Sequence, residues 1–348
     1  MLKPLLLVIS LVYRPFVFLR LQAYKKGWLK TYRPNIPVIS VGNLTVGGTG
    51  KTPVVDMLSK ELQSRKIKPA IISRGYGRKN NDTQKRLRFC ENKHTDPELF
   101  GDEPYMLAIR NPEVPVYVNS SRIAAANSAE KKDNPDMLVL DDAFQHLAIH
   151  RDLNLLLIDA EHGLGNGKLI PYGTLREPAS QWTRADAIII TKANISSANT
   201  VYEILKNDLE VNIPVFNFNF ETKFFSSLDG RNRQNIKNLA GKNLLTVSGI
   251  AQPDSFKKML KNLKGNIISN FEFADHHDYS NNDVHNILKK NDEIKPDYII
   301  TTEKDAVKLR QFSELKNSVW ILEIEVHPEE SWHHFFESYL DNLLSISC

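Results

Sequence analysis

The chain has 348 residues, of which 41% are hydrophobic and 25% are charged, and its formal net charge is +4. This composition excludes a disordered or collagen-like chain, and the length suits roughly two domains. The small, dispersed positive charge gives no reason to expect nucleic acid as a partner. The chain has two cysteines, Cys90 and Cys348, which argues against a disulfide framework and favours a reducing compartment.

The first 30 residues are apolar at the start and then basic and aromatic. Arg14-Pro15 interrupts the apolar run, and residues 24–30 read Tyr-Lys-Lys-Gly-Trp-Leu-Lys. No unbroken span of about 20 apolar residues occurs, which argues against a transmembrane helix, and the lack of a small-residue cleavage site argues against a signal peptide. The pattern suits a segment in the interface of an anionic membrane, and equally a helix packed on the domain. Both interpretations can hold for different faces.

Short runs rich in Val, Ile or Leu alternate with helix-like stretches after this segment. The alternation predicts an α/β fold with a parallel sheet and helices on both of its faces. Functional residues should then lie just past the carboxyl ends of the strands. The expected strands are residues 38–41, 70–73, 116–118, 137–140, 154–158 and 187–191.

A second, smaller α/β domain is expected after a boundary near Glu221. The expected strands around and within it are residues 214–221, 243–249, 267–273, 298–301 and 319–324, and the helices are 256–263 and 284–290. Residues 331–344 form an amphipathic pattern, which predicts a helix that packs back on the body. The predicted organisation is an N-terminal segment at 1–30, a first domain at 31–220, the smaller domain at 221–328 and the C-terminal helix at 329–348.

Residues 41–53 read Val-Gly-Asn-Leu-Thr-Val-Gly-Gly-Thr-Gly-Lys-Thr-Pro, between a β-branched run and a helix-like run. A strand, a glycine-rich loop and a helix in this order make a phosphate-binding P-loop, whose backbone N–H groups face a polyphosphate. Thr45 stands where the usual spacing has glycine, so a chance glycine-rich turn is the alternative. The expected nucleotide-binding residues are Gly47, Gly48, Thr49, Gly50, Lys51, which would reach the outer phosphates, and Thr52, which would bind Mg²⁺.

Acidic residues follow one expected strand and precede one expected helix. Asp141 and Asp142 end the run at 137–140, where an acid beside a P-loop typically holds Mg²⁺ directly or through water. The alternative is a cap for the following helix. Residues 101–104 read Gly-Asp-Glu-Pro, and Asp102 is either a helix cap or a carboxylate that accepts the proton of an attacking hydroxyl.

Three further polar clusters lie at or after strands. His276 and His277 are adjacent and project in different directions, so a catalytic or orienting histidine is favoured over a zinc site, with a surface loop as the alternative. Residues 301–305, Thr-Thr-Glu-Lys-Asp, either close over a nucleotide or cap a helix. Residues 191–194, Thr-Lys-Ala-Asn, are faintly similar to a guanine-reading motif but lack its Asp.

These motifs, in this order, resemble the tetraacyldisaccharide 4′-kinase family of lipid A biosynthesis. The motifs are specific together and weak singly. A P-loop without its first glycine is typical of that family, whereas Ala143 replaces the family's usual glycine and removes backbone freedom at that turn. The matching segments are residues 40–53, 73–77, 101–104, 141–146, 165–167, 175–178, 275–277 and 302–305.

The resemblance implies a P-loop NTPase-like fold and ATP- and Mg²⁺-dependent transfer of the γ-phosphoryl group. The acceptor would be the 4′-hydroxyl of a tetraacylated glucosamine disaccharide 1-phosphate. The protein would sit peripherally on the cytoplasmic face of a bacterial inner membrane, and we expect no nucleic acid and no obligate protein partner. The alternative is a P-loop ATPase or switch protein, against which a dedicated base at Asp102 argues, because hydrolytic switches orient water instead.

The resemblance also implies roles for single residues. Asp102, supported by His276, would be the acid–base pair, and Lys51 would be catalytic as well. Tyr76 would contact the nucleotide, and Glu103 would help to arrange the metal or its waters. The metal site would also take Thr52, Asp141 and Asp142, and the substrate contacts would be Arg122, Gln145, His146, Asn166 and Glu177.

Overall fold

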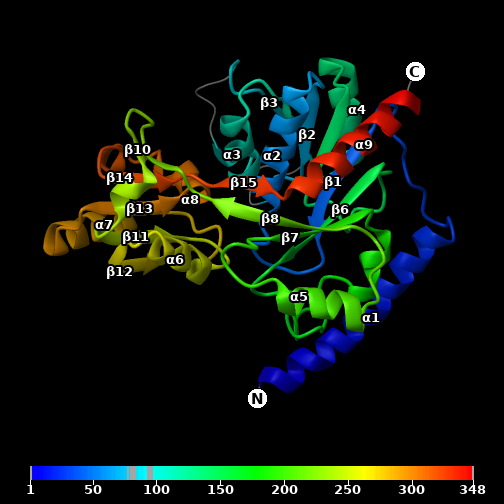
Figure 1. The fold of residues 1–348 in the computed structure, drawn as a ribbon, viewed down its shortest axis with the longest axis horizontal. Coiled ribbons are helices and arrows are strands. Elements are labelled where there is room, and N and C mark those ends of the chain that lie inside the picture. The colour runs from blue at the N-terminus through cyan, green and yellow to red at the C-terminus, as the bar shows by residue number, and fades with distance from the viewer. Residues whose placement is uncertain (1, 77, 79–83, 92–96, 347–348) are drawn as a thin grey trace.

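The chain folds into two units, each built around its own sheet (Figure 1). The computed structural model describes residues 2–76, 78, 84–91 and 97–346. The larger unit contains a nine-stranded sheet and the smaller unit a six-stranded sheet. The predicted α/β fold with a second, smaller α/β unit is therefore confirmed.

The larger sheet has the strand order β15-β8-β7-β6-β1-β5-β2-β4-β3. All inner pairs are parallel, and the two edge strands, β15 and β3, are antiparallel to their neighbours. The strands are β1 (Val38–Asn43), β2 (Pro69–Ser73), β3 (Lys85–Leu87), β4 (Val116–Val118), β5 (Met137–Asp141), β6 (Leu153–Asp159), β7 (Ala187–Thr191), β8 (Val215–Glu221) and β15 (Glu325–Pro328).

Helices cover both faces of this sheet, as the alternating pattern predicts. The helices of the larger unit are α1 (Leu2–Lys25), α2 (Lys51–Ser64), α3 (Asp102–Arg110), α4 (Arg122–Asp133), α5 (Asn199–Glu203) and α9 (Glu330–Ile346). Helices α2, α3 and α9 share a core with Ile39 and Ile189, whereas α4 packs over Val38 and α5 over Ile188. The helices therefore bury both faces of the sheet. Because successive residues of a strand point to opposite faces, nearly every residue of these strands is buried, and this explains why the strands are almost continuously apolar.

The smaller sheet has the strand order β10-β9-β14-β13-β11-β12. Strands β14, β13, β11 and β12 are parallel neighbours, and β9 and β10 complete the sheet as antiparallel strands. Its elements are β9 (Phe224–Ser227), β10 (Arg233–Asn235), β11 (Asn243–Ser248), α6 (Pro253–Asn262), β12 (Asn266–Glu272), α7 (Asn281–Ile294), β13 (Tyr298–Thr302), α8 (Glu303–Leu309) and β14 (Val319–Leu322).

The chain leaves the larger sheet after β8 and returns to it with β15. Val326 of β15 lies opposite Phe220 of β8. Residues 325–328, which the sequence places in the smaller domain, therefore belong to the larger sheet. Such a short strand carries almost no signal of its own, and only its partner defines it. Helix α9 then packs on the same sheet, with Trp332 5.4 Å from Phe216 between ring centroids.

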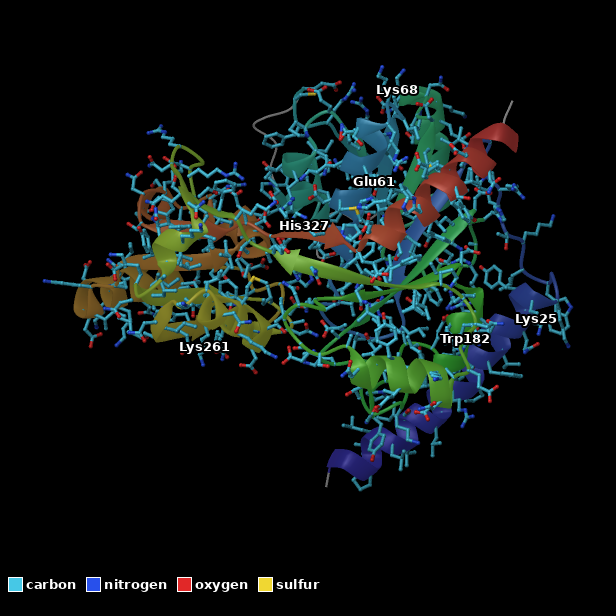
Figure 2. The ribbon with its side chains drawn as sticks, viewed as in Figure 1. Lys25, Glu61, Lys68, Trp182, Lys261 and His327 are labelled. Carbon is cyan, nitrogen blue, oxygen red and sulfur yellow. The ribbon has the colours of Figure 1, made fainter. Side chains whose placement is uncertain are left out.

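Helix α1 runs from Leu2 to Lys25 and includes Pro15, where the sequence predicts an interruption. A proline inside a helix removes one N–H donor, and here the helix continues through it. By length and composition alone, Pro4–Lys25 could cross a membrane, with a mean hydropathy of 1.7 and 11% of its most apolar window buried. Lys25 ends this helix on the opposite side of the molecule from Lys261 of the smaller unit (Figure 2).

One narrow face of α1 contacts the larger unit. Ser10 Oγ donates to the carbonyl of Leu169 at 2.9 Å, and the Tyr13 hydroxyl donates to the carbonyl of Arg176 at 3.1 Å. Val17 is buried on the same face, since positions 10, 13 and 17 follow helical spacing. The exposed apolar side chains of the helix are Leu5, Leu7, Val8, Ile9, Leu11, Val12, Phe16, Phe18 and Leu19. The helix is thus packed on one face and apolar toward solvent on the others.

Candidate active site

The carboxyl ends of the central strands meet at one edge of the larger sheet. Strand β1 ends at Asn43, β5 at Asp141, β2 at Ser73, β6 at Asp159 and β7 at Thr191. These strands are parallel neighbours in the sheet, so their polar end residues lie side by side. This is the edge at which parallel sheets place ligands.

The segment after β1 forms a glycine-rich turn that leads directly into α2. Gly50 has a left-handed φ of 77°, and a Cβ there would lie 2.4 Å from the ring of Phe220. Only glycine therefore fits at this position. Lys51 begins α2, and its Nζ lies 3.4 Å from Asn43 Oδ1 and 3.6 Å from Asp142 Oδ1. The strand, loop and helix of a P-loop are present, and the lysine lies next to Asp142, which directly follows the neighbouring strand β5.

Thr45, which replaces the usual first glycine of a P-loop, is held in a short antiparallel bridge with Leu175. The backbone N–H of Val46 donates to the carbonyl of Thr174 at 2.7 Å, and that of Arg176 to the carbonyl of Leu44 at 2.7 Å. Extended pairing requires no positive φ, so a glycine has no advantage at residue 45. The same pairing brings the segment that carries Glu177 against the loop.

Asp141 is a buried carboxyl that is only partly hydrogen-bonded. Its Oδ2 accepts from Ser73 Oγ at 3.3 Å, whereas Oδ1 has no hydrogen-bond partner among the described residues. Burial, together with the charges of Glu103 and Asp142, raises the pKa of Asp141 to about 7. A buried oxygen without a partner, among like charges, is a site that a cation would stabilise.

Asp142 is held differently from its neighbour. Arg176 Nη1 donates to its two carboxylate oxygens at 2.9 and 3.0 Å. Burial alone would raise the pKa of Asp142, but Lys51 and Arg176 hold it below its usual value. Residues 142–152, all of which are described, contain no helix, so neither acid caps one. The positive φ in this turn, 48°, is at Asp142, so Ala143 needs no glycine-like freedom.

Asp102 connects the larger unit to the smaller one. Gly101 is the N-cap of α3 and Asp102 is its first residue, so the carboxylate does not cap the helix. Its Oδ2 lies 3.1 Å from His276 Nδ1 and 3.2 Å from Lys308 Nζ. Both partners belong to the smaller unit. Burial alone would lower the pKa of Lys308, but Asp278 and Asp102 raise it, so this ammonium stays charged.

His276 is the histidine that faces Asp102, and its tautomer follows from its second contact. Its Nε2 lies 3.1 Å from Lys304 Nζ. A lysine ammonium can only donate, so Nε2 accepts and Nδ1 carries the hydrogen that is donated to Asp102. His277 turns away, with its Nε2 3.1 Å from Asp283 Oδ2 at the start of α7.

Tyr76 and the segment at 301–305 lie around this pair. Tyr76 is 69% exposed and its ring centroid is 5.3 Å from that of His276, so it lies beside the Asp102 site. Gly77, the last residue of the 73–77 motif, lies outside the described residues. The Thr302 hydroxyl accepts from the Asp305 N–H at 3.2 Å and thereby caps α8, so the cap predicted for this segment is present.

The candidate substrate residues, with one exception, lie in or next to the turn that follows β5. Arg122 Nη2 donates to the carbonyl of Asp142 at 3.1 Å, and Gln145 Nε2 donates to that of Asn43 at 2.8 Å. Burial and the nearby Arg122 lower the pKa of His146 to about 4, so it is neutral at pH 7. Asn166 is exposed, and its hydrogen bonds among the described residues stay within its own loop.

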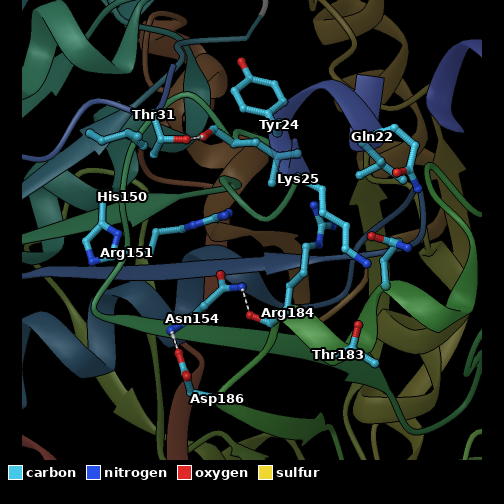
Figure 3. A pocket seen from close by; sticks show the side chains of 14 residues that line it. Gln22, Tyr24, Lys25, Thr31, His150, Arg151, Asn154, Thr183, Arg184 and Asp186 are labelled. Carbon is cyan, nitrogen blue, oxygen red and sulfur yellow. Dashed lines mark hydrogen bonds between the residues drawn. The ribbon is translucent and has the colours of Figure 1, made fainter. Parts of the chain in front are cut away.

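Glu177 is buried between two arginines. Arg184 donates to its Oε2, and Arg20 of α1 lies 3.5 Å from its Oε1. Arg184 also lines a cavity of about 560 Å³ next to the end of α1. Figure 3 shows Arg184 and Arg151 extending into this space, which Lys25 and His150 also border. The group that contains Glu177 therefore adjoins the helix that carries the exposed apolar surface.

Sequence reasoning missed the cations that surround the acids. Arg176 lies inside the 175–178 motif and Lys304 inside the 302–305 motif. Their position within these motifs was the signal that could have identified them. Lys308 follows Lys304 by one helical turn, and this i, i+4 spacing places both on one face of α8. None of the three can be assigned to a particular carboxylate without the fold.

A parallel sheet with a P-loop after its central strand, and an acid at the end of the next strand, defines a P-loop nucleotide-binding protein. The comparison with known proteins narrows this class. Residues 2–341 match the family model described as tetraacyldisaccharide-1-P 4′-kinase, LpxK. The chain belongs to this family.

Relatives of similar length carry the same name. The tetraacyldisaccharide 4′-kinase of Bdellovibrio bacteriovorus is 36% identical over 318 residues, which cover 91% of this chain and 93% of the relative. That of Geobacter metallireducens is 37% identical, with 88% of each chain covered. A crystal structure described as the "apo" form of LpxK from Aquifex aeolicus in complex with ATP is 31% identical, with a TM-score of 0.79 and 99% of each chain covered.

Proposed function

We propose that this chain is a kinase that transfers the γ-phosphoryl group of ATP to the 4′-hydroxyl of tetraacyldisaccharide 1-phosphate. Membership of the family over nearly the whole chain supports this function, and the Aquifex aeolicus relative was crystallised with ATP. The observation that carries the proposal is Asp102, a buried carboxylate held between His276 and Lys308 of the smaller unit. A hydrolytic switch has no need for such a base.

The donor nucleotide would occupy the P-loop. The N–H groups of the turn at 47–50 and the first turn of α2 would bind its phosphates, and Lys51 would contact the outer ones. Lys51 would have to leave Asn43 and Asp142, to which its contacts are long, at 3.4 and 3.6 Å. Tyr76, exposed beside His276, is a further candidate contact for the nucleotide.

The acceptor hydroxyl would lie against Asp102. As its oxygen attacks the γ-phosphorus and the bond to the β-phosphate oxygen breaks, the hydroxyl proton would pass to the Asp102 carboxylate. His276 would orient this carboxylate through its Nδ1–H, and Lys308 would keep it charge-balanced. Most of the rate enhancement would come from positioning and charge stabilisation rather than from the base.

The residues at the end of β5 fit a magnesium ion. Asp141 Oδ1 is buried without a hydrogen-bond partner among the described residues, and Thr52 is buried in the first turn of α2. The described residues include no group of three His, Cys, Asp or Glu side chains that could hold a metal alone, so phosphate oxygens would complete the site. A bound Mg²⁺ would neutralise charge on the transferred phosphoryl group.

Asp141 is a better candidate than Asp142 for a direct metal ligand. Both oxygens of Asp142 are occupied by Arg176, at 2.9 and 3.0 Å. Glu103 is close enough to Asp141 to raise the pKa of that carboxyl, which places it where it could bind waters of the ion. We therefore assign the direct contact to Asp141 and the outer contacts to Asp142 and Glu103.

The acceptor would be bound on the side of Arg122, Gln145, His146 and Glu177. Neutral His146 offers a nitrogen acceptor for sugar hydroxyl and amide groups. Glu177, whose two oxygens are held by Arg184 and Arg20, would position these arginines beside the acceptor. Asn166 contributes only if its loop moves, since its hydrogen bonds lie within that loop.

Helix α1 would rest on the cytoplasmic face of the inner membrane. A helix with one face fixed along the protein by Ser10, Tyr13 and Val17 cannot be surrounded by lipid, whereas its exposed apolar faces can enter the interface. Lys25 and Lys26 at its end would meet anionic headgroups. With this placement, a lipid acceptor could reach Glu177 while its acyl chains stay in the membrane.

Incubation with γ-labelled ATP and the lipid disaccharide tests the function. Label in the lipid, dependent on both Asp102 and Mg²⁺, is the expected result. Label found only in free phosphate, whether or not lipid is present, would instead support an ATPase or switch protein.

A further inference from the structure

The segment at 191–194 is not used for reading a base. Asn194 Nδ2 donates to the carbonyl of Phe220 at 2.9 Å, and Asn194 Oδ1 accepts from the Phe220 N–H at 2.9 Å. Both ends of the amide are therefore committed to the backbone of β8, and no group is left to recognise a nucleobase. The first two residues of the segment have a different task.

Thr191 and Lys192 hold the outer side of the P-loop. Thr191 Oγ1 donates to the carbonyl of Thr49 at 3.0 Å, and Lys192 Nζ donates to the carbonyl of Gly48 at 2.9 Å. When the N–H groups of a phosphate-binding loop face the ligand, its carbonyls point away and require donors of their own. These two side chains supply such donors.

The Lys192 ammonium is buried and fully committed. Besides Gly48, it donates to Asp159 Oδ2 at 2.6 Å and to Gln252 Oε1 at 2.6 Å. A lysine has three N–H donors, so these three acceptors use all of them. Lys192 also has a positive φ of 58°, which is uncommon for a residue with a side chain. The ammonium therefore acts on the loop from behind rather than as a phosphate ligand.

Gln252 makes this arrangement depend on the smaller unit. It precedes α6, and its side chain is the nearest neighbour of Cβ positions built on Gly47 and Gly48, at 3.8 and 3.7 Å. A second contact between the units lies close by but does not touch the loop. In that contact Lys258 of α6 donates to Glu161 at 3.3 Å and to Ser196 at 2.7 Å.

We infer that Lys192 is a positioning residue for the donor nucleotide, which fixes the Gly48 carbonyl and, through Gln252, ties the shape of the P-loop to the placement of the smaller unit. Nucleotide affinity then depends on the contact that Gln252 of the smaller unit makes with Lys192, and not on the loop alone. This inference rests on the proposed kinase function, because a loop that bound no nucleotide would need no such positioning.

Gln252→Met tests this inference without unpairing a buried charge. Methionine keeps the packing against the glycines but accepts no strong hydrogen bond, and Lys192 retains Asp159 and the Gly48 carbonyl. We expect the Kd of a non-hydrolysable ATP analogue, measured by calorimetry with Mg²⁺ on the full chain, to rise about three- to tenfold. The KM for ATP should rise with it, and the KM for the lipid acceptor should stay constant.

Lys258→Met is the matched control, because it loosens the same boundary between the units without touching the loop. Its nucleotide Kd should stay within about twofold of the native value. Equal losses in both variants, or an unchanged Kd in Gln252→Met, would overturn the inference. In a Lys192→Met background, Gln252→Met should cause no further loss; an additive loss would show that Gln252 does not act through Lys192.

These results separate the inference from the proposed function. A native chain that binds no ATP analogue would contradict the kinase function itself. If the native chain binds the analogue and labels the lipid, but Gln252→Met leaves the Kd of the analogue unchanged, only the role of Lys192 is contradicted.

Discussion

Replacing Asp102 by asparagine should remove the proton acceptor while keeping the shape of the site. General-base catalysis contributes about 10²–10⁴-fold, so kcat should fall by that factor, which corresponds to about 2.7–5.4 kcal/mol in the barrier. The surroundings should survive the change, because Lys308 keeps the carbonyls of His276 and His277 at 2.7 and 3.1 Å and the carboxylate of Asp278 at 2.9 Å. The loss should therefore report on the chemistry rather than on folding.

Phosphoryl transfer to the lipid from γ-labelled ATP, at saturating concentrations of both substrates, measures this loss. The Kd of an ATP analogue should remain native, because the Asp102 carboxylate contacts His276 and Lys308 of the smaller unit and not the P-loop. Asp278→Asn is the control, since it makes the same chemical change at another partner of Lys308 whose side chain is 95% exposed. A kcat for Asp102→Asn within about threefold of native, or an equal loss in the control, would refute the assignment.

Three further outcomes are expected. Lys51→Met should abolish detectable transfer by removing the contact to the outer phosphates, as the same assay will show. Because Asp141 has a pKa of about 7 and a cation requires its ionised form, the affinity for Mg²⁺–ATP should fall up to about tenfold per pH unit below pH 7 and level off above it. Calorimetry should show this slope in the native chain and not in Asp141→Asn. Phe16→Asp combined with Leu19→Asp should weaken binding to anionic vesicles at least about tenfold in a flotation assay, with an unchanged Kd for nucleotide.

The strands of the larger sheet are predictable because each one is buried on both faces and therefore almost purely apolar. Residues 137–140, for example, cannot be read as anything other than a buried element, and they form β5. The strands that escape prediction are short and lie at or near the edges of the sheets. β3 reads Lys-Arg-Leu and β10 reads Arg-Gln-Asn, with no apolar alternation. Their existence depends on a neighbouring strand that offers free backbone groups, which a local pattern does not contain.

The acids of the site are predictable because the ends of parallel strands meet at one edge of the sheet, and a motif such as Asp141-Asp142 marks its own position. The cations of the site are not predictable in this way, because the long side chain of a lysine or arginine could reach many carboxylates. Only the folded structure shows which carboxylate it contacts. Which histidine faces Asp102 is also decided by the fold. The backbone at His276 has a positive φ of 60°, and this conformation turns its ring toward α3 while that of His277 turns toward α7.

Under the proposed function, the contacts of α1 explain why a membrane-facing helix belongs to the catalytic unit. The Tyr13 hydroxyl donates to the backbone of Arg176, and the guanidinium of Arg176 holds Asp142, which in turn lies 3.6 Å from Lys51. Arg20, two turns further along the helix, contacts Glu177. The face of α1 that points away from the membrane thus contacts Glu177, on the acceptor side of the site, and Arg176, which holds Asp142 next to the P-loop. A lipid acceptor that stays in the membrane and a nucleotide that arrives from water would then meet at residues held by one helix.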